Sequence, residues 1–331
     1  MTTKELNPEK ILKMSGSYWE TCALHAAVNL DIFTILGKES MTAEEIAGKL
    51  NSGARGTIML LNALTAMDFL KKKDNKYANT PLSAAFLIKD SPKYLGHIII
   101  LHHSLVESWQ HLDQAVIDGR PLRKKIFHAE KEERENFLMG MFNLAMTIAP
   151  AVAAAIDLSG RRRLLDMGGG PGTYAIHFCM QNPDLKATVF DLPATRPVAE
   201  EIIDRFKMAE RINFEGGDYT FEDIKGKYDA AWLSHILHSE SPEGCRKIIG
   251  RSVSALEPGG MILIHDFILN NNMDGPLFPA LFALNMLLGT QSGRSYSEQQ
   301  IMGMLTEAGV KKIHRIDFES VNDSAIIAGY V

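Results

Sequence analysis

The sequence contains few cysteines. Only Cys22, Cys179 and Cys245 occur, scattered along 331 residues without paired spacing. This distribution argues against a disulfide framework and against a cysteine-rich zinc cluster. We therefore expect buried, reduced thiols and no metal site.

An excess of basic residues is also absent. The formal net charge is -5 and the isoelectric point is near 6.1. Nucleic-acid binding usually needs a positive field, so no nucleic-acid partner is expected. Residues Met1 to Lys10 are polar and charged, and no later apolar run approaches the length of a membrane span. The expected location is the cytoplasm, without a membrane partner.

The chain is long enough for two domains with ordinary cores, because 46% of its 331 residues are hydrophobic and 23% are charged. The residue pattern is helical up to about residue 160 and then alternates between short strands and helices. We expect one domain over residues 1–105 and a second over 106–331. Residues 106–159 are expected to be a helical connector that contributes to a ligand pocket.

The first domain has the pattern of a winged helix. Thr42 and Glu45 form a capping-box signature for one helix, and residues 54–67 continue another. Residues 69–78 then predict a hairpin around an Asp-Asn turn. A DNA-binding regulator is one hypothesis for such a domain. The candidate recognition helix argues against it, since Arg55 is its only cation and most of its circumference is apolar.

The remaining helical segments are marked by cap and proline pairs. Ser91 followed by Pro92 predicts a helix from Lys93, and a long helix is expected from about Lys131 to Ile156. His102 and His103 are adjacent in the intervening segment. Adjacent residues lie about 100° apart on a helix, so these histidines are predicted to flank a core rather than bind one ion.

A glycine-rich loop over residues 164–172 organises the second half. The apolar run that ends in Asp166 predicts a strand, the glycines a tight loop and the residues after them a helix. A dinucleotide fingerprint would need glycine where Thr173 stands, and the Gly-Lys-Ser/Thr signature of phosphate-binding loops is missing. What remains is Asp166-x-Gly168-x-Gly170-x-Gly172. This pattern resembles the first motif of class I S-adenosylmethionine-dependent methyltransferases.

Seven strands are predicted, which favours an α/β fold with a seven-stranded, Rossmann-like, largely parallel sheet and helices on both faces. The expected strands are Leu164–Met167, Thr188–Phe190, Ile212–Glu215, Asp229–Leu233, Met261–His265, Lys312–Asp317 and Ser324–Tyr330. Ligands of open α/β sheets bind beyond the carboxyl ends of the strands. Polar residues at those ends are therefore the candidates for chemistry.

Two of these strand ends predict adenosine binding. Asp191 can accept both ribose hydroxyls, and Asp218 can accept from the adenine amino group while Tyr219 stacks on or flanks the ring. Asp218 as a turn cap is the alternative. Leu192 and Ser234, next to strand ends, complete the predicted cofactor site.

Further motifs point to one family. They are Leu-Leu-Asp-Met-Gly-Gly-Gly-Pro-Gly, Phe190-Asp191-Leu192-Pro193, Gly217-Asp218-Tyr219, Ile236-Leu237-His238 and Leu256-Glu257-Pro258-Gly259-Gly260. With them, nearly the whole chain resembles the plant and bacterial small-molecule O-methyltransferases, of the acetylserotonin and caffeate type. The resemblance implies a homodimer formed by an all-α, winged-helix dimerisation domain. It also implies S-adenosylmethionine as donor, S-adenosylhomocysteine as product, and a hydroxyl of an aromatic or polycyclic small molecule as acceptor.

The resemblance assigns the catalytic base to His238 and its orienting acid to Asp266. A neutral phenol, with a pKa of about 10, is a poor nucleophile until its proton is removed, and histidine suits that task. The segment 276–289 is predicted to cap the acceptor pocket, with Phe282, Asn285 and Met286 facing it. Met146 and His235 are further candidates for the acceptor pocket. Alternatively, His235 is simply a residue at the end of a strand, without a role in the site.

Two departures from the family pattern keep other hypotheses open. The run Ser239 to Pro242 replaces the usual Asp-Trp, and Ser295 stands where a second acid is usual. The Ile-Leu-His-Ser segment at 236–239 also resembles a bacteriochlorophyllide C-20 methyltransferase, so carbon methylation of a tetrapyrrole or another polycycle is an alternative. A protein that retains the cofactor without methyl transfer is a further one.

Overall fold

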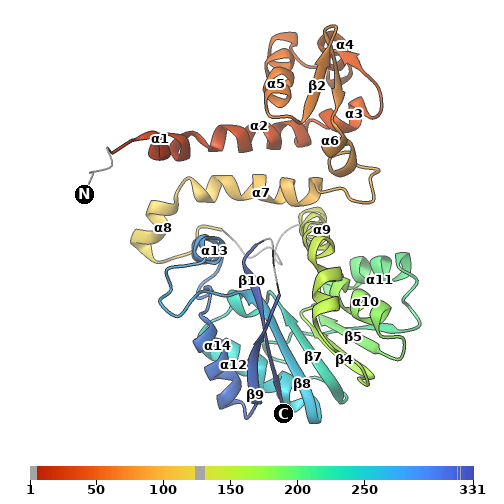
Figure 1. Cartoon of the computed structure of the whole chain (residues 1–331), viewed down its shortest axis with the longest axis vertical. Helices are drawn as coiled ribbons and strands as arrows, with labels where there is room; N and C mark the ends of the chain where they lie inside the picture. The colour runs from red at the N-terminus through yellow and green to blue at the C-terminus, as the bar shows by residue number, and fades with distance from the viewer. Residues whose placement is uncertain (1–5, 124–130, 319, 321) are drawn as a thin grey trace. The chain divides into compact units, whose positions relative to one another are not determined.

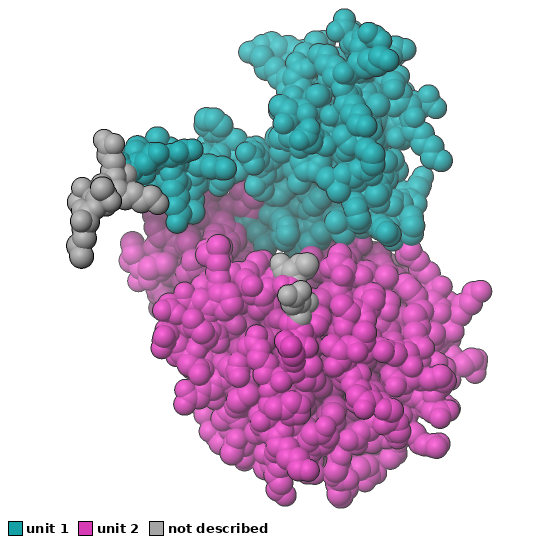
Figure 2. Space-filling model, in the orientation of Figure 1, with its two compact units in different colours: residues 1–105 teal, residues 106–331 magenta. Residues whose placement is uncertain are grey.

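The computed structural model describes residues 6–123, 131–318, 320 and 322–331. The chain divides into two compact units, residues 1–105 and 106–331, which Figure 2 distinguishes by colour. Figure 1 labels their helices and strands.

The first unit is helical, with a small sheet. Its elements are α1 (Glu9–Gly16), α2 (Tyr18–Asn29), α3 (Ile32–Leu36), β1 (Met41–Thr42), α4 (Ala43–Leu50), α5 (Ala54–Ala66), β2 (Leu70–Lys73), β3 (Lys76–Asn79), α6 (Pro81–Phe86) and α7 (Gly96–Trp109), which continues past the unit boundary. The predicted capping box is present, because Thr42 accepts from the Glu45 amide and the Glu45 carboxylate accepts from the Thr42 amide. The predicted hairpin is β2–β3, and β1 adds a third strand, in the order β1-β3-β2.

The second unit is a seven-stranded sheet between two layers of helices. Its elements are α8 (Leu112–Asp118), α9 (Lys131–Ala155), β4 (Arg163–Met167), α10 (Thr173–Gln181), β5 (Lys186–Asp191), η2 (Pro193–Thr195), α11 (Arg196–Arg205), β6 (Ile212–Gly216), β7 (Tyr228–Ser234), η3 (Leu237–Ser239), α12 (Pro242–Ser254), β8 (Leu256–Phe267), α13 (Leu277–Gly289), α14 (Glu298–Glu307), β9 (Lys311–Ile316) and β10 (Ser324–Tyr330). The strand order is β6-β5-β4-β7-β8-β10-β9, and β10 runs antiparallel to the other six strands of this sheet. The predicted seven-stranded α/β fold is confirmed.

Alternating side chains of the sheet build two cores. Trp232 and Leu263 face one way and pack with α9, α10 and α11, whereas Leu233 and Ile264 face the other way and pack with α12 and α14. Figure 1 shows these two helical groups on opposite sides of the sheet. Burial of these strands on both faces explains why residues 230–233 of β7 and 261–264 of β8 are continuous apolar runs.

Three local predictions are wrong. The fifth strand of the sheet begins at Leu256 instead of Met261, because Gly259 and Gly260 pair with the chain's last residue. The helix expected from Lys93 begins at Gly96, since the Ser91 hydroxyl accepts from the Lys93 amide in a turn instead. Cys22 is exposed, whereas Cys179 and Cys245 are buried.

The expectation that no apolar run approaches a membrane span also needs correction. Among the described residues, Glu133–Ala155 of α9, with 23 residues, is long and apolar enough by composition, and its most apolar 18-residue window has a mean hydropathy of 1.7. The helix packs on the core through Leu138, Phe142 and Val152. These contacts account for its apolar composition, and 44% of the apolar window is buried.

Candidate active site

The candidate site lies at the carboxyl ends of β4, β5, β7 and β8. The chain winds outward in opposite directions from β4 and β7, so the loops that follow these two neighbouring strands diverge. Such a switch point is where open α/β sheets bind their ligands. The glycine loop follows β4, Asp191 ends β5, Ser234 ends β7, and Asp266 lies one residue before the end of β8.

The loop after β4 needs its glycines for two reasons. Gly168, Gly170 and Gly172 all have positive φ, at 64°, 54° and 77°. A Cβ on Gly168 would also lie 2.6 Å from the Ile236 side chain, whereas a Cβ on Gly170 would meet no atom within 4 Å. The backbone at Gly170 therefore borders open space, where a ligand can approach it closely.

Asp166 is buried beneath this loop with one oxygen unsatisfied. Oδ2 accepts from the Ala175 amide at 3.3 Å, while Oδ1 has no hydrogen-bond partner in the described chain. Burial raises the pKa of Asp166 to about 7. The Thr173 hydroxyl is likewise buried and unpartnered. Orphaned polar atoms next to an open glycine loop suit a polar, positively charged ligand group.

The carboxylate of Asp191 faces the same loop. Its Oδ2 accepts from the Gly170 amide at 2.7 Å and its Oδ1 accepts from the Leu192 amide at 2.6 Å. Burial raises the pKa of Asp191, although these hydrogen bonds oppose the rise. The side chain is fixed against the loop and retains lone pairs that could accept further hydrogen bonds.

Asp218 and Tyr219 follow β6. Asp218 Oδ1 accepts from the Thr220 amide at 2.8 Å, so this side chain does cap a turn. The Tyr219 ring lies beside the glycine loop, since a Cβ on Gly168 would come within 3.2 Å of it. Turn capping through one oxygen leaves the other able to accept from a ligand.

Ser234 belongs to a buried relay that the sequence did not reveal. Its hydroxyl lies 2.9 Å from Nδ1 of His265, whose Nε2 lies 2.9 Å from the Ser324 hydroxyl. His265 is fully buried and stacks on Trp232. Burial lowers the pKa of His265 well below its ordinary value, so this ring is neutral and fixes the Ser234 hydroxyl.

His238 and Asp266 form the central contact of the site. Nδ1 of His238 lies 2.7 Å from Oδ1 of Asp266, and the His238 amide donates to Oδ2 at 3.2 Å. Burial alone would raise the pKa of Asp266, but the electrostatic attraction of His238 and His235 and the hydrogen bond of the His238 ring outweigh it and hold this pKa well below its usual range. Asp266 is therefore an anion that selects the tautomer with the proton on Nδ1, which leaves Nε2 of His238 as a proton acceptor.

The main chain of His238 is fixed as well. Its carbonyl accepts from the Arg294 amide at 2.8 Å, and a Cβ on Gly293 would lie only 2.5 Å from that carbonyl oxygen. Ser295, where a second acid is usual, donates its hydroxyl to the Pro279 carbonyl at 2.7 Å instead. Asp266 is consequently the carboxylate partner of His238 within the described residues.

Aromatic rings surround the His238 imidazole. Phe282 meets it edge to face at a centroid distance of 4.7 Å, and Phe267 lies parallel to it at 6.0 Å. Phe278 packs on both phenylalanines. The sequence predicted Phe282; it missed the role of Phe267, which follows Asp266 directly on β8 and could have been found as the next residue of that strand end.

His235 lies close to the Asp266 carboxylate as well. Its Nδ1 is 3.6 Å from Oδ1 of Asp266, and its backbone has a positive φ of 55°. Burial lowers the pKa of His235, so the ring is neutral at pH 7. The ligand atoms of His235, His238 and Asp266 lie within 4.8 Å of one another, a spacing that could hold a metal ion.

The other predicted pocket residues have different surroundings. Asn285 and Met286 lie on α13, the helix that carries Phe282, and the Asn285 side chain accepts a hydrogen bond from Arg123. Met146, on α9, packs against the core formed with α10 and α11. Arg123 was not found from the sequence, because nothing local marks a contact over 162 positions.

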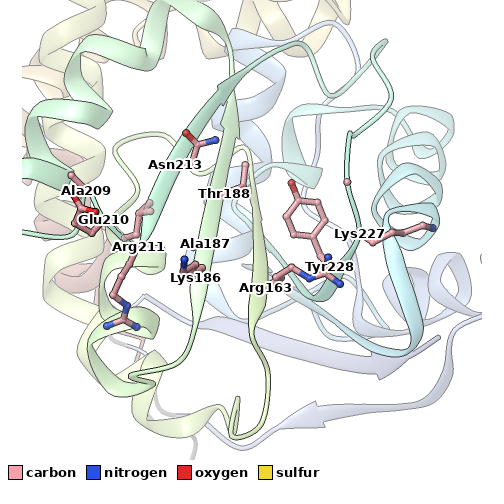
Figure 3. A pocket seen from close by; sticks show the side chains of 12 residues that line it. Arg163, Lys186, Ala187, Thr188, Ala209, Glu210, Arg211, Asn213, Lys227 and Tyr228 are labelled. Atoms are coloured by element: carbon pink, nitrogen blue, oxygen red, sulfur yellow. The ribbon is translucent and has the colours of Figure 1, made fainter.

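A hollow at the opposite edge of the sheet is the alternative location. Its volume is about 360 Å³, and Figure 3 shows residues 163, 186–188, 209–213 and 226–228 around it, at the amino ends of β4 to β7. Three of its four cations make structural contacts: Arg163 pairs with Glu257, Arg211 donates to the Cys179, Asn182 and Leu185 carbonyls, and Lys227 donates to the Ser254 carbonyl. These contacts are structural, so the chemistry is assigned to the carboxyl edge.

Comparison with known proteins agrees with this assignment. An O-methyltransferase domain model matches residues 109–311, and an O-methyltransferase dimerisation domain model matches residues 12–89. The chain is 32% identical over 329 residues to the 3-hydroxy-5-methyl-1-naphthoate 3-O-methyltransferase of Streptomyces sahachiroi, covering 97% of this chain and 95% of that protein. It is 29% identical to the tetracenomycin polyketide synthesis 8-O-methyl transferase TcmO of Streptomyces glaucescens, covering 91% of each.

A solved structure gives the same result. The crystal structure of human N-acetylserotonin methyltransferase in complex with S-adenosylmethionine matches with a TM-score of 0.89 and 25% identity, over 100% of this chain and 99% of that chain. The open glycine loop and the orphaned Asp166 oxygen fit a donor of that kind. The chain belongs to the O-methyltransferase family, and its methyl donor is S-adenosylmethionine.

Proposed function

We propose that the protein methylates a hydroxyl group of an aromatic or polycyclic small molecule, with His238 as general base. The hydrogen bond of 2.7 Å between His238 Nδ1 and Asp266 carries this proposal. It holds Nδ1 protonated, which leaves Nε2 with the lone pair that removes a proton from an acceptor.

The reaction needs little else from the protein. Bound S-adenosylmethionine would supply an electrophilic methyl group on a positively charged sulfur; an in-line attack on the methyl carbon would form the C–O bond and release S-adenosylhomocysteine. Nε2 of His238 takes the hydroxyl proton as the oxygen attacks, and Asp266 stabilises the imidazolium that forms. Phe267 and Phe282 exclude water from the ring and offer flat apolar surfaces to an aromatic acceptor.

The donor is assigned to the glycine loop and the neighbouring strand ends. Asp166, with Gly168, Gly170 and Gly172, faces its amino acid part, and Asp191 and Leu192 face the ribose. Asp218 and Tyr219 face the adenine, and Ser234 borders the site. The unsatisfied Asp166 oxygen and the fixed Asp191 carboxylate support this assignment.

The acceptor is assigned to the region around α13. Phe282, Asn285, Met286 and His235 are its proposed contacts, supported by the aromatic cluster on His238. Met146 and the connector 106–159 are proposed to complete this pocket. The aromatic acceptors named for two relatives favour the same class of substrate.

The first unit is proposed to be a winged-helix homodimerisation domain. Helix α1 buries none of its residues, and Ile11, Met14 and Trp19 are each at least 66% exposed. Exposed apolar side chains at this density mark a protein interface. A dimer that becomes monomeric in sedimentation velocity on Trp19→Asp supports this assignment, and an unchanged sedimentation coefficient contradicts it.

Neither a nucleic acid nor a membrane is a proposed partner, and the proposed location is the cytoplasm. Helix α5, the candidate recognition helix, carries Arg55 as its only cation. DNA readers need several exposed cations, so this helix suits packing better than groove recognition.

Product analysis tests the proposed function. The protein is incubated with S-adenosylmethionine carrying a ¹³C methyl group and a panel of hydroxylated naphthalenes and polycycles, and the product is assigned by NMR. A methoxy carbon supports the proposal. A methyl group on carbon, or cofactor binding without any methylated product, contradicts it and favours the carbon-methylation or non-transferring alternatives.

A further inference from the structure

Arg123 is tied to α13 by its backbone and its side chain. The amides of Leu122 and Arg123 both donate to the Leu288 carbonyl at 3.0 Å. Nη2 of Arg123 donates to the Asn285 carbonyl at 2.9 Å and to its side-chain Oδ1 at 2.8 Å. The guanidinium therefore sits at the carboxyl end of α13, where the helix dipole favours a cation.

The contacts with α13 leave part of the Arg123 guanidinium without a hydrogen-bond partner among the described residues. Its Nε is buried without a hydrogen-bond partner, and no carboxylate in the described part of the chain lies within ion-pair distance of it. Burial lowers the pKa of Arg123, which reports the cost of holding the charge there. Gly289 leaves room for this position of the group, since a Cβ there would lie 2.8 Å from Nη2 and the guanidinium would have to shift.

This contact sets which way the Asn285 amide points. A guanidinium can only donate, so the oxygen of the amide must face Arg123 and its NH₂ group must face away. That NH₂ group makes no hydrogen bond with the described residues, whereas Oδ1 is engaged. Asn285 thus presents two N–H donors that no described residue occupies.

The donors lie on the face of α13 that meets the base. Phe278, Phe282 and Asn285 follow one another at intervals of four and three positions, which places them on one side of a helix. Phe282 contacts the His238 ring on that side. An acceptor whose hydroxyl reaches Nε2 of His238 can therefore reach the Asn285 amide with a second polar group.

We infer that Arg123 is a positioning residue that fixes Asn285 as a hydrogen-bond donor. The acceptor molecule then carries a second oxygen-containing group in addition to its reacting hydroxyl, and this group is a carboxylate or a ring carbonyl. The Arg123 guanidinium behind the amide, which pairs with no carboxylate of residues 6–123 or 131–331 as far as these are described, polarises its N–H groups and favours the carboxylate. The inference rests on the proposed function, because it takes His238 to mark the reacting hydroxyl.

Three acceptors that differ only in the group at one ring position test the inference. 3-Hydroxy-1-naphthoate carries a carboxylate and 2-naphthol lacks it, while 3-hydroxy-1-naphthamide carries a neutral carbonyl. Dissociation constants are measured by calorimetry in the presence of S-adenosylhomocysteine, so that they do not depend on catalysis, and kcat and KM are measured separately. The wild type should bind the naphthoate at least about tenfold more tightly than 2-naphthol, with the amide between them.

Two variants separate positioning from helix capping. Asn285→Asp keeps an oxygen for Arg123 but removes the donor, and Arg123→Gln frees the amide to rotate. Both should reduce the naphthoate preference by about tenfold through KM, with a smaller change for 2-naphthol, while the affinity for S-adenosylhomocysteine stays nearly unchanged. Arg120→Gln, an exposed arginine three positions before Arg123, is the control and should keep the preference.

Three results would overturn the inference. One is a wild type without preference for the naphthoate, including failure to bind either acceptor. Another is an equal loss for both acceptors in Asn285→Asp, which indicates helix capping alone. The third is an unchanged preference in both variants. Failure of the proposed function is distinct: the naphthoate would bind preferentially, yet His238→Ala would leave its methylation unaffected.

Discussion

The His238 imidazole and the Asp266 carboxylate are joined at two points. Nδ1 meets Oδ1 at 2.7 Å, and the His238 main-chain amide donates to Oδ2 at 3.2 Å. The carboxylate therefore fixes both the ring and the backbone of the same residue. Because the Asp266 side chain is only 5% exposed, solvent does little to weaken this arrangement.

Replacing Asp266 by asparagine keeps the size of the side chain and removes its control over the protonation of the His238 ring. The amide of Asp266→Asn fills the same volume but can donate a hydrogen bond to Nδ1, which would move the imidazole proton to Nε2. We expect turnover to fall by about 10²-fold or more with the affinity for S-adenosylmethionine retained. Steady-state kinetics and calorimetry measure the two quantities, and unaltered turnover would remove Asp266 from the mechanism.

Replacing Asp191 should weaken binding of the methyl donor. Asp191→Ala removes the carboxylate that holds the Gly170 amide and is proposed to accept from the ribose, so the dissociation constant of S-adenosylhomocysteine should rise by about tenfold or more. Asp204→Ala, an exposed change on α11, is the matched control. Equal affinities of the two variants in calorimetry would contradict the ribose assignment.

The raised pKa of Asp166 predicts that the affinity for S-adenosylmethionine depends on pH. Its folded pKa of about 7 lies above the ordinary value of a carboxyl group, so its contribution to folding stability is present at low pH and is lost as pH rises toward 7. The positive charges of S-adenosylmethionine favour the ionised form, so binding should release protons and strengthen as pH rises from about 6 to 8.

Calorimetry in buffers of different ionisation enthalpy measures that proton release. Asp166→Asn cannot ionise and should lose both the release and the pH slope. A variant that releases as many protons as the wild type would show that another group titrates.

Metal removal should leave the reaction unaffected. The spacing of His235, His238 and Asp266 could hold a cation, but a metal on His238 would occupy the lone pair that the base needs. Dialysis against a chelator should therefore preserve turnover, and added Zn²⁺ should inhibit. Activity that disappears with the chelator and returns with a divalent cation would contradict the role of His238 as a base.

Much of the fold could be predicted because its signals are local. The Thr42–Glu45 capping box at the start of α4, for example, involves residues three positions apart. Strand ends with polar residues placed Asp191, Ser234 and Asp266 at one edge of the sheet. Regular spacing is enough to predict such features.

Contacts between distant segments could not be predicted. Ser324 reaches His265 over 59 positions and Arg123 reaches Asn285 over 162, and neither partner carries a local signal. The predicted start of β8 was wrong for the same reason. Gly259 and Gly260 belong to the strand because they pair with the distant Val331.

The central claim, that His238 removes the acceptor proton, is tested most directly by the turnover of His238→Ala on naphthols of increasing acidity. An acceptor that is already ionised needs no base. The variant should lose about 10²- to 10⁴-fold on 2-naphthol and recover most of this loss on nitro-substituted naphthols, while the wild type changes little across the series. A loss that is the same for every acceptor, or no loss at all, would contradict the claim.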